Sequence, residues 1–113
     1  MDGMNWAEEL GVAITVSDSE GKIVYMNSKA ASVFSKEGGK SLIGSGLRDC
    51  HNPASWEKIL QILGSGRPNC YTIEKNGIKK MIFQAPWYEN GTVAGLVELS
   101  MEIPFEMDHF VRS

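Results

Sequence analysis

The chain of 113 residues is 42% hydrophobic and 22% charged, which is typical of one globular domain and excludes a collagen-like, coiled-coil or disordered chain. Its 11 Lys and Arg residues and 14 Asp and Glu residues give a net charge of −3, and no basic run is longer than Lys79-Lys80. We therefore expect no nucleic-acid partner. No membrane association is expected either, because the apolar runs fall far short of the roughly 20 residues that a membrane helix needs.

The sequence predicts a single domain over residues 1–113, since no repeat, low-complexity stretch or linker divides it. It holds only two cysteines, Cys50 and Cys70, and begins without the apolar stretch of a secretion signal. A disulfide framework is therefore not expected, and the reducing cytoplasm is the expected location.

The start of the chain predicts one short helix and two strands. Asn5 followed by Glu8 is typical of a helix N-terminal cap and predicts an N-terminal cap helix within residues 1–10. Apolar and polar residues then alternate over 12–16, which predicts a strand, and a second strand is expected over 22–26 after an acidic turn.

Two further helices are expected in the middle of the chain. Asn27 can cap a helix over residues 28–34. Asn52 can cap a longer helix over 53–63, with Pro53 at the first helical position. One face of this long helix is expected to be buried, because apolar residues recur on it at Trp56, Ile59, Leu60 and Leu63.

The last third predicts a three-stranded antiparallel meander. The dipeptides Asn76-Gly77 and Asn90-Gly91 supply the positive φ angles of tight hairpin turns. Strands are expected over residues 69–75, 78–88 and 92–103. Pro104 ends the last strand, and the apolar tail over 104–113 is expected to dock on another surface.

The facing of side chains across this meander follows if each hairpin loop has an even number of residues. One face then carries Tyr71, Ile82, Gln84, Val97, Leu99 and Met101. The other face carries Cys70, Met81, Phe83, Leu96, Glu98 and Ser100. We assign the first set to the core, because its residues are the apolar ones of the alternating final strand.

The order of these elements resembles the PAS domain family over residues 6–103. The segment from Ala13 to Asn27, AITVSDSEGKIVYMN, is similar to the start of a PAS domain, in which two strands flank an acidic turn with Gly and an Asn caps the next helix. Leu42-Ile43-Gly44 is similar to the apolar step that precedes the long helix in this family. The resemblance implies an α+β fold, with a PAS-like five-stranded antiparallel sheet and short helices and one longer helix packed on one face.

The resemblance also implies a sensory module rather than an enzyme. The sequence holds no serine elbow, Gly-x-Gly-x-x-Gly, phosphate loop or Cys-x-x-Cys, so no catalytic residue is predicted. We expect a small, partly apolar ligand between the long helix and the sheet, with signalling through the packing of a dimer or of a signalling protein partner. A ligand-free dimerisation module is the alternative.

Cys50-His51 lies just before the long helix, where members of this family place cofactor contacts. Its thiolate or imidazole could ligate haem iron or another metal, and an ordinary exposed loop is the other interpretation. Haem-binding relatives take their histidine from the long helix, which has none here, so a haem or metal sensor is kept as an alternative. A flavin is not expected, because Asp49-Cys50-His51-Asn52-Pro53-Ala54 departs from the motif Asn-Cys-Arg-Phe-Leu-Gln of flavin photosensors.

Gln84 is the polar residue that the strand pattern turns towards the core. A buried amide without partners is destabilising, so Gln84 is expected to bond a side chain, a water or a ligand. Bonding to loop backbone, or an odd hairpin that turns it outward, is the alternative. The candidate ligand-contacting residues are Gln84, Tyr25, Phe34, Cys50, His51, Trp56, Leu60, Tyr71, Val97 and Leu99, with ordinary core packing as the alternative for the aromatic and aliphatic ones.

The opposite face of the sheet would be exposed and apolar in a lone domain. An apolar surface of this kind needs a cover, which the N-terminal helix or a second copy of the chain could supply. We therefore predict a homodimer through this face. The expected interface residues are Trp6, Leu10, Met81, Phe83, Trp87 and Leu96.

Overall fold

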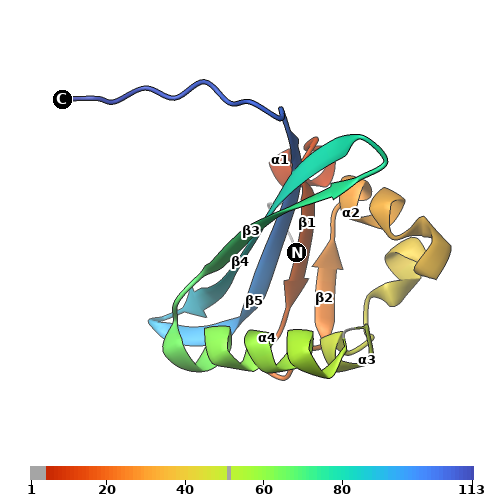
Figure 1. Cartoon of the computed structure of the whole chain (residues 1–113). Helices are drawn as coiled ribbons and strands as arrows, with labels where there is room; N and C mark the ends of the chain where they lie inside the picture. Colours follow the sequence, from red (N-terminus) through yellow and green to blue (C-terminus); the bar gives the residue numbers. More distant parts are fainter. Residues whose placement is uncertain (1–4, 51) are drawn as a thin grey trace.

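The computed structural model describes residues 5–50 and 52–113, apart from the side chains of residues 5, 49 and 50. Its strands form one antiparallel sheet in the order β2-β1-β5-β4-β3 (Figure 1). The strands are β1 (Ala13–Ser17), β2 (Ile23–Met26), β3 (Asn69–Lys75), β4 (Ile78–Glu89) and β5 (Thr92–Ile103). The predicted five-stranded α+β fold is therefore confirmed.

Helical segments lie on both faces of this sheet. The long helix α4 (Pro53–Ser65) passes in front of the sheet in Figure 1, and the N-terminal helix α1 (Asn5–Glu8) lies behind it. The other segments are α2 (Ser28–Val33), the 3₁₀-helical η1 (Ser35–Glu37) and η2 (Gly39–Leu42), and α3 (Leu47–Cys50).

Each face has its own apolar core. The helical face, covered by α2 to α4, buries Ala13, Ile23, Met26, Ala30, Leu47, Ile59, Ile62 and Leu96. The outer face, covered by α1, buries Ala7, Ile14, Val16 and Tyr25, with Trp87, Val97 and Leu99 packed against them. Strand β1 contributes to both cores, because alternate side chains of a strand point to opposite faces.

The N-terminal caps form as the sequence indicated. The Asn52 side chain accepts a hydrogen bond from the Ser55 amide at 2.8 Å, and Asn27 accepts one from the Ala30 amide at 3.0 Å. Gly66, in the left-handed conformation, ends α4. Both caps place the following helix over the helical face of the sheet.

The buried stripe of α4 differs from the prediction at Leu60, which is 43% exposed. Ile59 and Ile62 are the buried residues of this helix. Trp56 packs against the turn at Gly21, where an added Cβ would lie 2.9 Å from the indole ring. Because Trp56 and Ile62 both pack against the protein, the buried face of α4 is turned so that Leu60 points away from it. The predicted and the observed sets of buried residues both fit the helical period.

The β4–β5 hairpin departs from the predicted register at a β-bulge. Tyr88 pairs with Val93, but Trp87 pairs with Gly95, so β5 carries one extra residue. A Cβ at Gly95 would lie 1.9 Å from the backbone oxygen of Ser17, so only glycine fits the bulge. The two-residue loop of this hairpin was predicted correctly. From the pair of Trp87 with Gly95 onwards, however, the bulge shifts each β4–β5 pair by one residue from the predicted register.

This shift exchanges the side chains of β5 between the two faces. Leu96, Glu98 and Ser100 lie opposite Pro86, Gln84 and Ile82 on the helical face, and Val97, Leu99 and Met101 lie on the outer face. Leu96 is 2% exposed in the helical core, so its prediction as a dimer contact was wrong. Val97 and Leu99 pack beside Ile14 and Val16, so their predicted position on the ligand side was also wrong.

After Ile103 the chain has no regular secondary structure and leads away from the sheet (Figure 1). The apolar residues of this tail, Phe105, Met107, Phe110 and Val111, are each more than half exposed. The tail was expected to dock on another surface, and the sheet of its own chain is not that surface. Among the described residues, no helix combines the length and apolarity needed to cross a membrane.

Candidate functional site

A cavity of about 480 Å³ lies between the helical face of the sheet and the segment from α2 to α3. Its size falls within the range of small-molecule sites. The residues that line it are Thr15, Ser17, Ile23, Met26, Phe34, Glu37, Leu42, Leu47, Leu96 and Glu98. None of these described residues comes from α4, so the expected position between the long helix and the sheet was wrong in this respect. Helix α4 covers the sheet beside the cavity instead.

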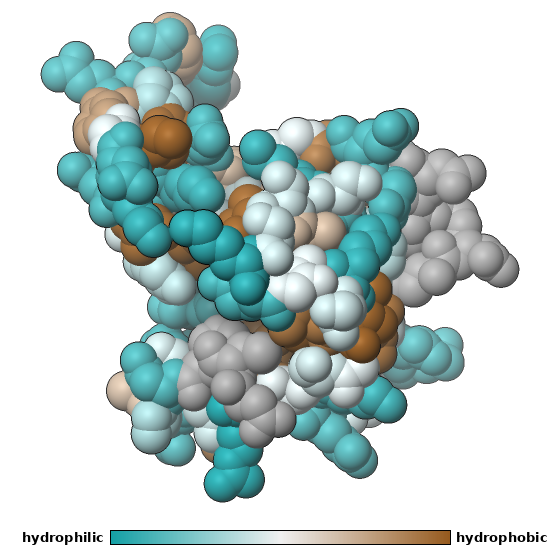
Figure 2. Space-filling view, turned by 90° about the vertical axis from the view of Figure 1, so that its right-hand side faces the viewer, coloured by the Kyte–Doolittle hydropathy of each residue, from teal (hydrophilic) through white to brown (hydrophobic). Residues whose placement is uncertain are grey.

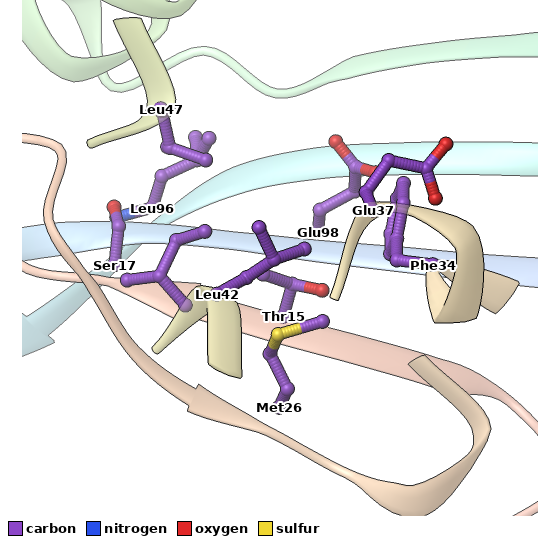
Figure 3. A pocket seen from close by; sticks show the side chains of 10 residues that line it. Thr15, Ser17, Met26, Phe34, Glu37, Leu42, Leu47, Leu96 and Glu98 are labelled. Carbon is purple, nitrogen blue, oxygen red and sulfur yellow. The ribbon is translucent and has the colours of Figure 1, made fainter. Parts of the chain in front are cut away.

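The surface on the side of α2 and α3 is mainly hydrophilic, with apolar residues in separate patches (Figure 2). The cavity itself is largely apolar and has two unlike ends (Figure 3). Leu47 and Leu96 lie at one end, and Glu37 and Glu98 lie beside Phe34 at the other. A molecule in this cavity would therefore meet aliphatic side chains at one end and carboxylates at the other.

Gln84 lies on the helical face and is 5% exposed, so its predicted direction is confirmed. Its Nε2 donates to Oε2 of Glu98 at 2.9 Å, and its Oε1 accepts from Nδ2 of Asn69 at 3.0 Å. Both hydrogen bonds go to side chains, so the loop-backbone alternative does not apply. The amide does not line the cavity itself; it holds the carboxylate that does.

Sequence reasoning missed Glu98 and Asn69 as members of this site. Asn69 could have been found, because it pairs with Gln84 in the β3–β4 register that the first hairpin turn predicts. Glu98 could have been found only by placing the bulge. An isolated glycine within a strand, here Gly95, is the sequence signal for that feature.

A second hollow of about 240 Å³ adjoins the cavity, between α2 and strands β3 and β4. The two spaces share Thr15, Phe34 and Glu98 as a common wall. Tyr71 lines this second hollow on the predicted face of the sheet and is 43% exposed. Burial, and after it the negative charge of Glu98, raise the pKa of the Tyr71 hydroxyl.

Tyr25 lies on the outer face, so its predicted direction towards a ligand was wrong. An irregularity between Val16 and Ser17 shifts the β1–β2 register and pairs Tyr25 with Val16. The hydroxyl donates to Oε2 of Glu8 in α1 at 2.8 Å. Burial and this bond to a carboxylate raise the pKa of Tyr25 to about 12.

Of the other candidates, Phe34 lines the cavity, whereas Trp56 packs beside it and Leu60 is exposed. His51 and the side chain of Cys50 lie outside the described residues, so their role in ligand or metal binding stays a prediction. Within the described part of the chain, no group of three His, Cys, Asp or Glu side chains is placed to hold a metal ion.

Apart from Leu96, the residues predicted for the dimer surface lie on the outer face or in the N-terminal segment that adjoins it. Met81, Phe83 and Trp87 are half-buried on the outer face, and Trp87 donates its indole N–H to the Ser17 carbonyl at 2.8 Å. Trp6 in α1 is 67% exposed and Leu10 is 41% exposed. Helix α1 therefore covers part of the outer face through Ala7 while presenting its tryptophan to solvent.

Neither a protein-family model nor a curated protein matches the sequence, but solved structures match the fold. The PAS domain of a protein from Colwellia psychrerythraea matches with a TM-score of 0.62 and 22% identity, covering 85% of this chain and 89% of that one. The Aer2 receptor from Vibrio cholerae, a dual PAS-heme oxygen sensor, matches with a TM-score of 0.64 and 14% identity, covering 82% and 95%. Vibrio cholerae VqmA matches with a TM-score of 0.70 and 15% identity, covering 97% of this chain and 56% of that one. The chain therefore has the PAS fold, as the sequence resemblance implied.

Proposed function

We propose that the chain is a non-catalytic sensory module that binds a small, partly apolar molecule in the cavity on the helical face. The observation that supports this most directly is a largely apolar cavity of about 480 Å³ whose polar end is organised by Gln84 and Glu98. A solved structure shows VqmA, which shares this fold, bound to DPO. A cavity of this size favours a ligand-binding module over the ligand-free alternative.

The signal would pass through β1 and the adjoining β2–α2 junction. Thr15 and Ser17 line the cavity, whereas Ile14 and Val16 of the same strand pack in the core that α1 covers. Met26 also lines the cavity, and the next residue, Asn27, donates a hydrogen bond to the Ala7 carbonyl of α1. Occupation of the cavity would thus bias the packing of α1.

The output surface is the outer face, which we propose as a homodimer contact. Phe83 and Trp87 are only half-buried there, and the indole of Trp6 is exposed. A partner chain or a signalling protein bound to this face would contact α1, so a change in the packing of α1 would change that contact. The composition argument against direct binding of nucleic acid stays a prediction.

Native mass spectrometry of the freshly purified protein, with an absorbance spectrum of the same sample, tests the proposal. We expect a dimer that carries extra bound mass. Leu42→Trp, which fills the cavity from η2, should abolish the extra mass and leave the dimer. Leu60→Trp, an equal enlargement at an exposed position of α4, should change neither. Bare protein in every sample, or loss of the bound mass only in Leu60→Trp, would refute the ligand site.

The alternative of a haem or metal sensor predicts colour in the same sample. It also predicts that His51→Ala or Cys50→Ala removes this colour, whereas Cys70→Ala, at an exposed thiol on β3, does not. The Aer2 receptor, named as a dual PAS-heme sensor, shows that this fold can hold haem. A colourless preparation with bound mass would favour the small-ligand proposal.

A further inference from the structure

The acidic end of the cavity carries a chemical preference of its own. Glu37 and Glu98 both line the cavity, and its described lining contains no Lys, Arg or His. A carboxylate placed against apolar walls is stabilised by a charged or strongly hydrogen-bonding partner. The preference of this end of the cavity therefore depends on the partner that Glu98 has within the protein.

Glu98 is held by a neutral group. Its Oε2 accepts from the Gln84 amide, whose orientation is set by the hydrogen bond from Asn69 on the far side. Over residues 5–50 and 52–113, the ion pair found is Lys40 with Glu8, so no described cation lies within ion-pair distance of Glu98. Gln84 thus fixes the position of the carboxylate without neutralising its charge.

Lys80 lines the second hollow together with Glu98, but it does not line the cavity. Glu98 belongs to the wall between the two spaces, so a charge on its carboxylate acts on both. The raised pKa of Tyr71, to which the Glu98 charge contributes, is consistent with this position. On the cavity side, the charges that the described residues present are negative.

An anionic ligand would therefore be repelled at this end, and a neutral one would leave the charge unpaired. A protonated amine would pair with Glu98 and Glu37, and the ring of Phe34 beside them offers a further favourable surface for a cation. Its apolar body would extend towards Leu47 and Leu96, as the two ends of the cavity require.

We propose that the cavity selects a small cationic amphiphile, a protonated amine on an apolar body, with the cation bound between Glu98 and Glu37. This inference rests on the proposed ligand-binding function and adds the chemical class of the ligand. It assigns Glu98 as the residue that determines specificity and Gln84 as the residue that positions it.

Three probes that share a phenethyl body test the charge preference: phenethylamine, phenethyl alcohol and hydrocinnamate. Binding is followed by methyl-resolved NMR at Met26 and Leu96, which line the cavity. We expect phenethylamine to bind at least about tenfold more tightly than the alcohol, or about 1.4 kcal/mol, and hydrocinnamate to bind most weakly.

In Glu98→Gln the affinities for the amine and the alcohol should come to within about threefold of each other, because the new amide still bonds Gln84 but carries no charge. Glu37→Gln, at an exposed position of η1, should reduce the preference without affecting folding. Glu102→Gln is the matched control, since it removes the same charge from an exposed position on β5 outside the cavity lining. It should leave the preference unchanged.

The outcomes separate this inference from the proposed function. Equal binding of the three probes with shifts at Met26 and Leu96 would leave the ligand cavity standing and overturn the amine preference. A preference that survives both Glu98→Gln and Glu37→Gln would also overturn it. If none of the probes shifts the cavity methyls while native mass spectrometry shows bound mass that Leu42→Trp removes, the amine preference fails and the ligand cavity stands. If that bound mass is absent as well, both proposals fail.

Discussion

Asn27 has all the hydrogen-bonding positions of its side-chain amide occupied inside the protein. Its Nδ2 donates to the carbonyls of Ala7 and Val12, each at 2.8 Å, and its Oδ1 accepts from the amides of Ile14 and Ala30, each at 3.0 Å. The residue is 0% exposed. One side chain therefore joins α1, the loop before β1, β1 itself and the start of α2.

We predict that Asn27→Ala lowers the free energy of unfolding by at least about 3 kcal/mol, because it leaves several buried backbone groups without partners at about 1–3 kcal/mol each. Urea unfolding measures this loss. Asn52→Ala is the matched control, since it removes an exposed helix cap that contributes about 1 kcal/mol. Equal losses in the two variants would contradict a special role for Asn27.

At the scale of elements, the bulge in β5 decides which side chains face the cavity on the helical face of the sheet. The backbone of Gly95 lies against Ser17 and Asp18, where an added Cβ would be 1.9 Å from the Ser17 oxygen and 2.7 Å from the Asp18 carbonyl carbon. Both contacts are with backbone, which cannot move aside as a flexible side chain can. The bulge is therefore fixed by a contact between β1 and β5, which lie far apart in the sequence.

Gly95→Ala should lower the free energy of unfolding by more than an ordinary overpacking substitution, which costs about 1–3 kcal/mol. Thermal or urea unfolding gives the size of the loss. Gly11→Ala provides the control, because nothing lies within 4 Å of an added Cβ there, and its effect should stay within about 1 kcal/mol. A Gly95→Ala variant as stable as Gly11→Ala would show that the bulge tolerates a side chain.

The same elements show what the sequence could predict. Local signals were sufficient for the caps at Asn27 and Asn52 and for the two hairpin turns, because these depend on neighbouring residues. The facing of Gln84 followed from the first hairpin, which has no bulge. The facing of Leu96 and Glu98 did not follow, because it depends on the tertiary contact at Gly95. The cavity position depended on how α2 to α3 fold over the sheet, which no local pattern specifies.

At the scale of the whole molecule, Glu8 connects the helix of the outer face to the segments of the helical face. It accepts hydrogen bonds from Tyr25 on β2 at 2.8 Å and from Ser28 on α2 at 3.2 Å, and it forms an ion pair with Lys40 on η2. These contacts lower the pKa of Glu8 below its usual value of 4.5, the Lys40 bond most of all. Movement of η2 at the cavity would therefore reach α1 through this carboxylate.

The signs of the two pKa shifts define a pH window for this connection. Glu8 is more acidic in the folded state, so its contribution to stability is present above pH 4.5 and is lost as the pH falls through the lowered value. Tyr25 has its pKa raised from 10 to about 12, so its contribution is present below pH 10 and is lost as the pH rises towards about 12. Between these limits both groups hold α1 in place.

A spectrophotometric titration of the tyrosines tests this arrangement. We predict a tyrosinate transition near pH 12 that is absent in Tyr25→Phe and still present in Tyr88→Phe, whose ring is exposed. In Glu8→Gln the transition should move below 12 but remain above 10, because the charge of Glu8 is removed while the burial of the hydroxyl, the larger cause, persists. If the transition in Glu8→Gln stays at its wild-type position, Glu8 does not hold Tyr25, and the contact of α1 with β2 does not run through this hydrogen bond.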